Sequence, residues 1–164
     1  MSMKFIADAM LGRLAKWLRI MGFDVLYYRD IDDREIVRIA REQERTILTR
    51  DTHFIERKGL PGVILVDKDD VFEQLMLIRA RLDFNQAAFS GRCVVCNGVL
   101  DEVPQKEEVR DLVPEFIYIN FTRFSRCLEC GKVYWEGSHY RGIRDKVRGV
   151  LSTAEERQPE EGRH

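Results

Sequence analysis

The 164-residue sequence lacks long apolar runs and contains few histidines and prolines. No stretch approaches the roughly 20 consecutive apolar residues of a membrane span, so we expect no contact with a membrane. The first residues, MSMKFIADAMLGR, mix acidic and basic side chains with apolar ones and show no small-residue cleavage site, which argues against a secretory signal. These absences predict a cytoplasmic protein, in which thiols stay reduced.

The sequence also lacks an excess of charge of either sign. The net charge is −1, so the whole-chain charge indicates no class of partner. Only residues 123–148, with seven basic and three acidic side chains, are clearly basic. The three histidines form no persuasive set with a serine or cysteine, so covalent catalysis by such a pair is not indicated.

The apolar pattern of residues 3–84 alternates between strand-like runs and helical spacing. We expect strands at residues 3–7, 23–28, 46–49 and 63–66, and helices at residues 10–21, 33–43, 53–58 and 71–82. Strands that alternate with helices of this length favour an α/β fold, with a parallel sheet flanked by helices.

The periodicity lapses between residues 84 and 90, where we place a domain boundary. We therefore predict a first domain at residues 1–85, a small second domain at residues 86–151 and a disordered polar tail at residues 152–164. Within the second domain, residues 116–121 and 133–135 look like strands, and residues 106–113 fit one short helix.

The second domain holds two Cys-x-x-Cys pairs separated by 30 residues. They are Cys93, Cys96, Cys127 and Cys130. Two such pairs supply four sulfurs in the tetrahedral arrangement that Zn²⁺ prefers. Gly98 and Gly131 follow the pairs, where a tight turn is expected to need a positive φ angle. The spacing predicts a structural zinc ribbon; two disulfides, a redox pair and an iron site are the alternatives.

Three aspartates are expected to meet at one edge of the parallel sheet. Asp8 and Asp51 follow the first and third expected strands, and Asp33 opens the second helix. Ligands of such sheets bind at the carboxyl ends of the strands. Three carboxylates there repel one another unless a divalent cation neutralises them. Such a cation, activating water, is a common device for hydrolysing phosphodiesters.

Helix capping is an alternative explanation for each aspartate taken alone. Asp8 and Asp51 stand directly before expected helical residues, and Asp32 has the spacing of a capping box with Glu35. From the residues alone, capping and metal binding both remain open.

Five segments carry a resemblance to a known family. They are FIADAMLGRLA (5–15), DREI (33–36), TILTRD (46–51), RCVVCNG (92–98) and CLECGKVYWEGSH (127–139). Together they resemble the PIN-like ribonuclease domain called the Mut-seven C-terminal domain, which joins a compact PIN-type domain to a C-terminal zinc ribbon. The resemblance implies a ribonuclease that uses Mg²⁺ or Mn²⁺, and it matches Asp8, Asp33 and Asp51 to the family's acidic positions.

Cations and aromatic rings interleave near the end of the ribbon, a composition suited to single-stranded RNA. The candidates for RNA contact are Arg13, Lys16 and Arg19 on the first helix, and Trp135, His139 and Arg141 in the ribbon. An exposed polar helix face explains the first three equally well, and packing on the zinc turns explains the aromatic ring. A catalytically inactive RNA- or protein-binding adaptor with the same fold is the alternative function. The oligomeric state stays open.

Overall fold

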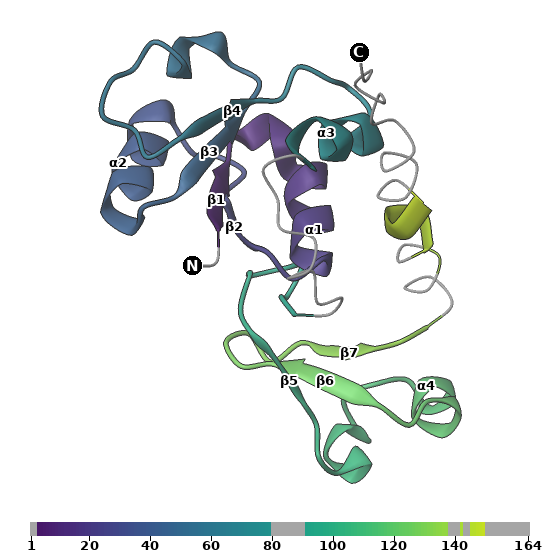
Figure 1. Cartoon of the computed structure of the whole chain (residues 1–164). Helices are drawn as coiled ribbons and strands as arrows, with labels where there is room; N and C mark the ends of the chain where they lie inside the picture. Colours follow the sequence, from purple (N-terminus) through teal and green to yellow (C-terminus); the bar gives the residue numbers. More distant parts are fainter. Residues whose placement is uncertain (1–2, 80–90, 138–141, 143–144, 150–164) are drawn as a thin grey trace, which may run out of the picture.

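The computed structural model describes residues 3–79, 91–137, 142 and 145–149. Its first unit is a parallel sheet of four strands in the order β2-β1-β3-β4 (Figure 1). These strands are β1 (Lys4–Ala7), β2 (Asp24–Tyr27), β3 (Thr46–Thr49) and β4 (Val63–Leu65). All four were expected from the apolar pattern, and the fold is the α/β class that the pattern predicts.

Helices cover both faces of this sheet because each of them carries one apolar stripe. The helices are α1 (Gly12–Ile20), α2 (Asp33–Gln43) and α3 (Val71–Ile78). Leu14 and Leu18 of α1 pack with Leu75 of α3 in one core cluster. Ile36 and Ile39 of α2 pack in a second cluster on the other face. The short helix expected at residues 53–58 is a 3-10 turn, η2 (Thr52–Phe54).

The strand order creates a switch point between β1 and β3. The connection from β1 passes through α1 to β2, whereas the connection from β2 passes through α2, on the opposite face, to β3. From β1 the chain continues to β2 on one side, and from β3 it continues to β4 on the other side, so the carboxyl ends of β1 and β3 form the position where doubly wound sheets bind ligands. Asp8 and Asp51 follow these two strands.

The second unit is an antiparallel sheet in the order β5-β6-β7, with a small core of its own. Its elements are β5 (Leu100–Glu102), the 3-10 turn η5 (Lys106–Val109), α4 (Glu115–Asn120), β6 (Phe124–Cys127) and β7 (Val133–Trp135). With the four cysteines described below, this sheet has the form of a zinc ribbon. β7 and the start of the short helix match the expectation.

The strand expected at residues 116–121 is wrong, because this segment forms α4. Ile117 and Tyr118 pack on the ribbon core, whereas Phe116 is 70% exposed. Pro114 at the N-cap has a fixed φ angle and precedes this six-residue helix. A six-residue apolar run fits the period of a strand and that of a helix, so contact with the ribbon core decides which of the two structures forms.

The last described residues, 145–149, return to the first unit. Residues 145–149 are helical, and Val147 is buried in the same core cluster as α1 and α3. The expected boundary at residues 85/86 and the expected tail at residues 152–164 lie outside the described residues. Among the described helices, none is long and apolar enough to cross a membrane.

Candidate functional site

The four cysteines of the ribbon converge on one point. Their sulfur atoms all lie within 4.8 Å of one another, and all four cysteines are free of disulfide bonds. Cys93 Sγ lies 3.7 Å from Cys130 Sγ, and Cys96 Sγ lies 3.4 Å from Cys127 Sγ. A tetrahedral ion with Zn–S bonds of about 2.3 Å separates its sulfurs by about 3.8 Å. The donor set and its spacing therefore fit Zn²⁺.

The two glycines beside the cysteines have different roles. Gly131 has a φ angle of 78°, as the turn was expected to require. At the first pair the positive φ angle, 67°, belongs to Asn97 and not to Gly98. Gly98 is needed for space, because a Cβ atom there would lie 2.7 Å from Cys127 Sγ. The expectation of a positive φ angle at Gly98 is therefore wrong.

The four thiols cannot all ionise without a cation between them. Burial disfavours the thiolate of Cys93, but hydrogen bonds from the Tyr134 hydroxyl and nearby backbone amides outweigh burial and lower its pKa to about 6. Burial and the neighbouring thiols raise the pKa of Cys96 to about 12. A Zn²⁺ ion would remove this repulsion by bonding to all four sulfurs.

Asp8 lies at the carboxyl end of β1 and is 7% exposed. Its Oδ1 accepts the backbone N–H of Met10 at 2.8 Å, which caps the 3-10 turn η1 (Ala9–Leu11). Its Oδ2 accepts the Thr49 hydroxyl and the backbone N–H of Arg50, both at 2.8 Å. Asp8 therefore does the capping that was kept open from the sequence, and it also joins β1 to the end of β3.

Thr49 connects Asp8 to Asp51. The Thr49 hydroxyl donates to Asp8 and accepts the backbone N–H of Asp51 at 2.9 Å. Asp51 Oδ1 in turn accepts the backbone N–H of His53 and contacts His53 Nδ1 at 2.6 Å. The hydrogen bond from that backbone amide, then the imidazole, hold the pKa of Asp51 below its ordinary value. Asp51 is thus a capping residue with an ionised, partly exposed carboxylate.

Asp33 is the first residue of α2 and is exposed. The adjacent Asp32 is the N-cap and accepts the backbone N–H of Glu35 at 2.9 Å. Among the described residues, the four cysteines are the only group of three or more His, Cys, Asp or Glu whose ligand atoms lie within 4.8 Å of one another. The three aspartates share one edge of the sheet but do not form a preassembled three-carboxylate site.

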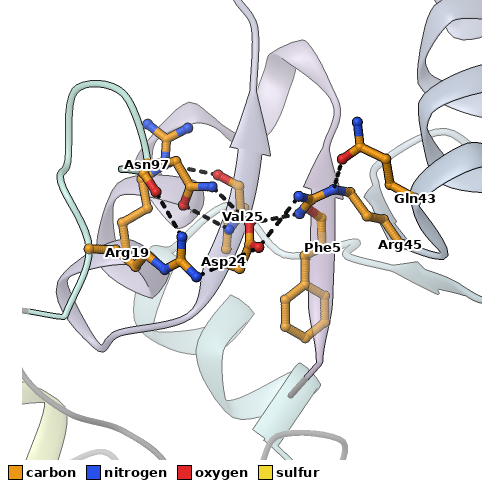
Figure 2. Close-up of polar contacts among 8 residues, drawn as sticks. Phe5, Arg19, Asp24, Val25, Gln43, Arg45 and Asn97 are labelled. Atoms are coloured by element: carbon orange, nitrogen blue, oxygen red, sulfur yellow. Dashed lines mark hydrogen bonds and ion pairs between the residues drawn. The ribbon is translucent and has the colours of Figure 1, made fainter. Parts of the chain in front are cut away.

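The ribbon contacts the first unit at the amino ends of the strands, away from the three aspartates described above, where β2 begins (Figure 2). Within the described residues no strand pairs with the outer side of β2, so the polar groups of Val25 need other partners. Asn97 Oδ1 accepts the Val25 N–H at 3.0 Å, and Arg19 Nε donates to the Val25 carbonyl at 2.9 Å. Arg19 also donates to the carbonyl of Val94 at 3.0 Å, so one side chain joins α1, β2 and the ribbon.

Asp24, the first residue of β2, is the charged centre of this contact. Its carboxylate accepts Arg45 Nη1 at 2.7 Å and Asn97 Nδ2 at 2.8 Å, as Figure 2 shows. Arg92 of the ribbon lies 3.8 Å from the same carboxylate. Burial would raise the pKa of Asp24, but the hydrogen bonds from Arg45 and Asn97 outweigh burial and lower it. Asp24 therefore stays charged while partly buried.

The residues predicted to contact RNA differ in their exposure to solvent. Arg13 and Lys16 are exposed on α1, and Trp135 is half-buried beside the ribbon core. Arg19 is only 5% exposed, so the expectation that it shares an exposed face with Arg13 and Lys16 is wrong. Its guanidinium is used at the contact between the units. His139 and Arg141 lie outside the described residues.

Fold and cysteine site together define an α/β domain of the doubly wound type joined to a zinc ribbon. Residues 3–147 match the family model described as Mut7-C RNAse domain, and the chain therefore belongs to the Mut7-C RNAse domain family. The resemblance seen in the motifs is thereby confirmed, and membership indicates a nuclease-type protein. No curated protein and no solved structure gives a significant match to the chain.

Sequence reasoning assigned no role to three polar residues that organise these sites. They are Asp24, Thr49 and Asn97. Thr49 precedes the Arg-Asp motif and Asn97 directly follows a cysteine pair, so both stood next to recognised signals. Their partners lie 41 and 73 residues away in the chain, a separation that periodicity does not bridge.

Proposed function

We propose that this protein is a divalent-metal-dependent ribonuclease whose zinc ribbon helps to hold single-stranded RNA. The observation that carries the proposal is the linked pair Asp8 and Asp51 beside the β1/β3 switch point. A crevice at this position of a doubly wound sheet is the usual place for a ligand. Membership in the Mut7-C RNAse domain family supports RNA as that ligand.

The carboxylates at this edge fit a Mg²⁺ or Mn²⁺ ion that takes few ligands from the protein. Mg²⁺ is usually held by one or two carboxylates, several waters and the substrate's phosphate oxygens. A carboxylate offers about four acceptor positions, and Asp8 uses three of them. Asp51 Oδ2 accepts no hydrogen bond in the described part of the chain. Asp8 and Asp51 would hold the ion, and Asp33 would complete the acidic edge.

Each part of the edge has a separate task in this proposal. When bound, the ion polarises a phosphoryl oxygen and lowers the pKa of the attacking water. Thr49 keeps Asp8 and Asp51 on adjacent strand ends, and the low pKa of Asp51 keeps its carboxylate charged at neutral pH. Arg13, exposed in the first turn of α1, attracts phosphate toward the acids.

The test is cleavage of mixed RNAs in Mg²⁺ or Mn²⁺ by the parent, Asp51→Asn and the matched control Asp111→Asn. Asp111 is an exposed aspartate of the ribbon, so its replacement removes the same charge away from the sheet edge. We expect Asp51→Asn to lose more than about tenfold in rate, because even residues behind a metal ligand are worth that much. Equal cleavage rates for the parent and Asp51→Asn would show that the Asp51 carboxylate takes no part in cleavage.

One observation favours the alternative of a catalytically inactive adaptor. In the described part of the chain Asp8 and Asp51 are engaged in capping, and the three aspartates do not form a preassembled cluster. An adaptor binds RNA or protein but has no metal-dependent cleavage to lose. A parent protein that binds RNA and leaves it intact in Mn²⁺ would establish this alternative.

We also propose that the cysteines hold one structural Zn²⁺ and that the protein works in the reducing cytoplasm. The four free thiols and their tetrahedral spacing support both parts. Elemental analysis of the purified chain is expected to give one zinc per molecule. A fully folded, metal-free protein would contradict the zinc site.

A further inference from the structure

A cavity of about 550 Å³ lies between α1 and the ribbon sheet. Its walls include Lys16 and Ile20 of α1, Arg123 and Lys132 of the ribbon, and the rings of Tyr134 and Trp135. Two residues singled out from the sequence for RNA contact, Lys16 and Trp135, therefore line one groove although they are far apart in the chain.

The groove is cationic at its rim and aromatic at one wall. Lys16 makes no hydrogen bond or ion pair within the described part of the chain, so its ammonium group is available to a ligand. Lys132 lies 5.5 Å from the centre of the Tyr134 ring. Cationic residues outnumber acidic ones in the lining by four to two. Cations for phosphates beside rings for bases are the elements of a single-strand binding groove.

The two walls are held together by the contact at β2. Arg19 belongs to the last turn of α1, and its hydrogen bond to Val94 ties that wall directly to the ribbon. Asn97 and Asp24 form the second attachment. The groove is thus a fixed feature of how the two units pack, and not a gap between independent domains.

The far end of the groove, at Ile20, and the acidic edge lie at opposite ends of α1, and Lys16 lies between them. Asp8 precedes the helix by a few residues, whereas Ile20 ends it, about 12 Å from Gly12 at 1.5 Å per residue. Roughly four stacked nucleotides, at about 3.4 Å each, span that length.

We propose that this groove binds single-stranded RNA at nucleotides roughly four positions away from the scissile phosphate. The inference rests on the proposed ribonuclease function for the position of the scissile phosphate, but the binding itself does not depend on catalysis. The groove then acts as a second anchor, so substrates long enough to reach it bind more tightly than shorter ones.

The binding test uses the full-length, zinc-loaded chain and fluorescein-labelled RNAs of 4 and 12 nucleotides, without Mg²⁺ or Mn²⁺. Lys16→Glu is compared with Lys58→Glu, which makes the same change of charge on an exposed lysine outside the groove. We expect Lys16→Glu to weaken binding of the 12-mer more than about fivefold and to lower the slope of log affinity against log salt by about 0.7. Lys58→Glu is expected to match the parent.

Trp135→Leu provides a second variant, because leucine keeps apolar contact with the ribbon core but removes the ring that stacks on a base. It is expected to weaken the 12-mer by more than about fivefold with an unchanged salt slope. Zinc content and thermal midpoint check that each variant is folded.

Cleavage of the two RNAs separates this inference from the proposed function. We expect Lys16→Glu to raise KM for the 12-mer but not for the 4-mer, which does not reach both sites. Unchanged 12-mer affinity in both groove variants would refute RNA binding by the groove, and the proposed ribonuclease function would be unaffected. A groove-dependent affinity in a parent that never cleaves RNA overturns the ribonuclease function, together with the stated distance from a scissile phosphate.

Discussion

Asn97 and Asp24 join the two units of this protein through a 2.8 Å hydrogen bond between residues 73 positions apart. Asn97 is also the residue with a positive φ angle that closes the turn of the first cysteine pair. The backbone conformation that brings Cys93 and Cys96 to a metal therefore also aims the Asn97 side chain at β2. We therefore predict that zinc binding and attachment of the ribbon are coupled through this residue.

Removal of zinc is predicted to detach the ribbon while the first unit stays folded. The amide of Val25 is the reporter, because its N–H is held by Asn97 and not by a neighbouring strand. Hydrogen exchange at Val25 is expected to accelerate after chelation, whereas the amides of buried strand β1 stay protected. Protection of Val25 that survives complete zinc removal would contradict the coupling.

Replacing Asn97 with glycine is predicted to destabilise the protein by about 2 kcal/mol. Glycine retains the positive φ angle but leaves the Val25 N–H and one acceptor of Asp24 without their partner. Denaturant unfolding measures the loss. Glu44→Gly is the matched control, since Glu44 also has a positive φ angle, 54°, and ends α2 on the surface. A loss no larger than that of the control would show that the turn, and not the contact, is affected.

Asp8→Asn is predicted to lower stability by about 1–3 kcal/mol, whatever its effect on cleavage. The amide group would turn a donor toward either the Met10 or the Arg50 N–H, both of which now donate to a carboxylate. Asp51→Asn retains an oxygen for the His53 N–H and is expected to lose less stability than Asp8→Asn. Asp51 is therefore the cleaner position for the catalytic test. Equal stability of the two variants would contradict the structural role of Asp8.

Tyr134→Phe is predicted to weaken zinc binding by about 10- to 100-fold, because the Tyr134 hydroxyl lies 3.0 Å from Cys93 Sγ and orients this ligand. Competition with a coloured chelator measures the affinity. Tyr118→Phe removes a hydroxyl from a ring on the ribbon core, away from the cysteines, and is expected to leave zinc affinity unchanged.

Zinc binding at pH 7 is predicted to release at least two protons. Without metal, the pKa of Cys96 is raised to about 12 and that of Cys130 is also raised, so both are thiols at pH 7 and must lose protons to bind. Cys93, with its pKa lowered to about 6, is mostly ionised at pH 7. Zinc binding therefore releases a further proton from Cys93 mainly below pH 6. Zinc affinity should therefore fall more steeply with acidification below pH 6. Calorimetry in buffers of different ionisation enthalpy counts the protons; a release near zero would contradict the thiol assignment.

Local patterns were enough to predict much of this protein. The alternation of apolar runs predicted all four strands of the parallel sheet, because each buried strand and each amphipathic helix has its own period. The two Cys-x-x-Cys pairs predicted the convergence of the four cysteines, because ligand geometry is largely set within each short turn. The edge shared by Asp8 and Asp51 followed from the direction of parallel strands.

Contacts between distant residues decided the rest. The segment 115–120 became helical through its contact with the ribbon core, and Arg19 was withdrawn from solvent because β2 has a free edge that needs a donor. The groove between α1 and the ribbon depends on two contacts between distant residues, that of Arg19 with Val94 and that of Asn97 with Asp24. The sequence by itself therefore determined the elements and the cysteine site, whose physics is local. The tertiary structure decided which polar groups are buried together, since that depends on which surfaces meet.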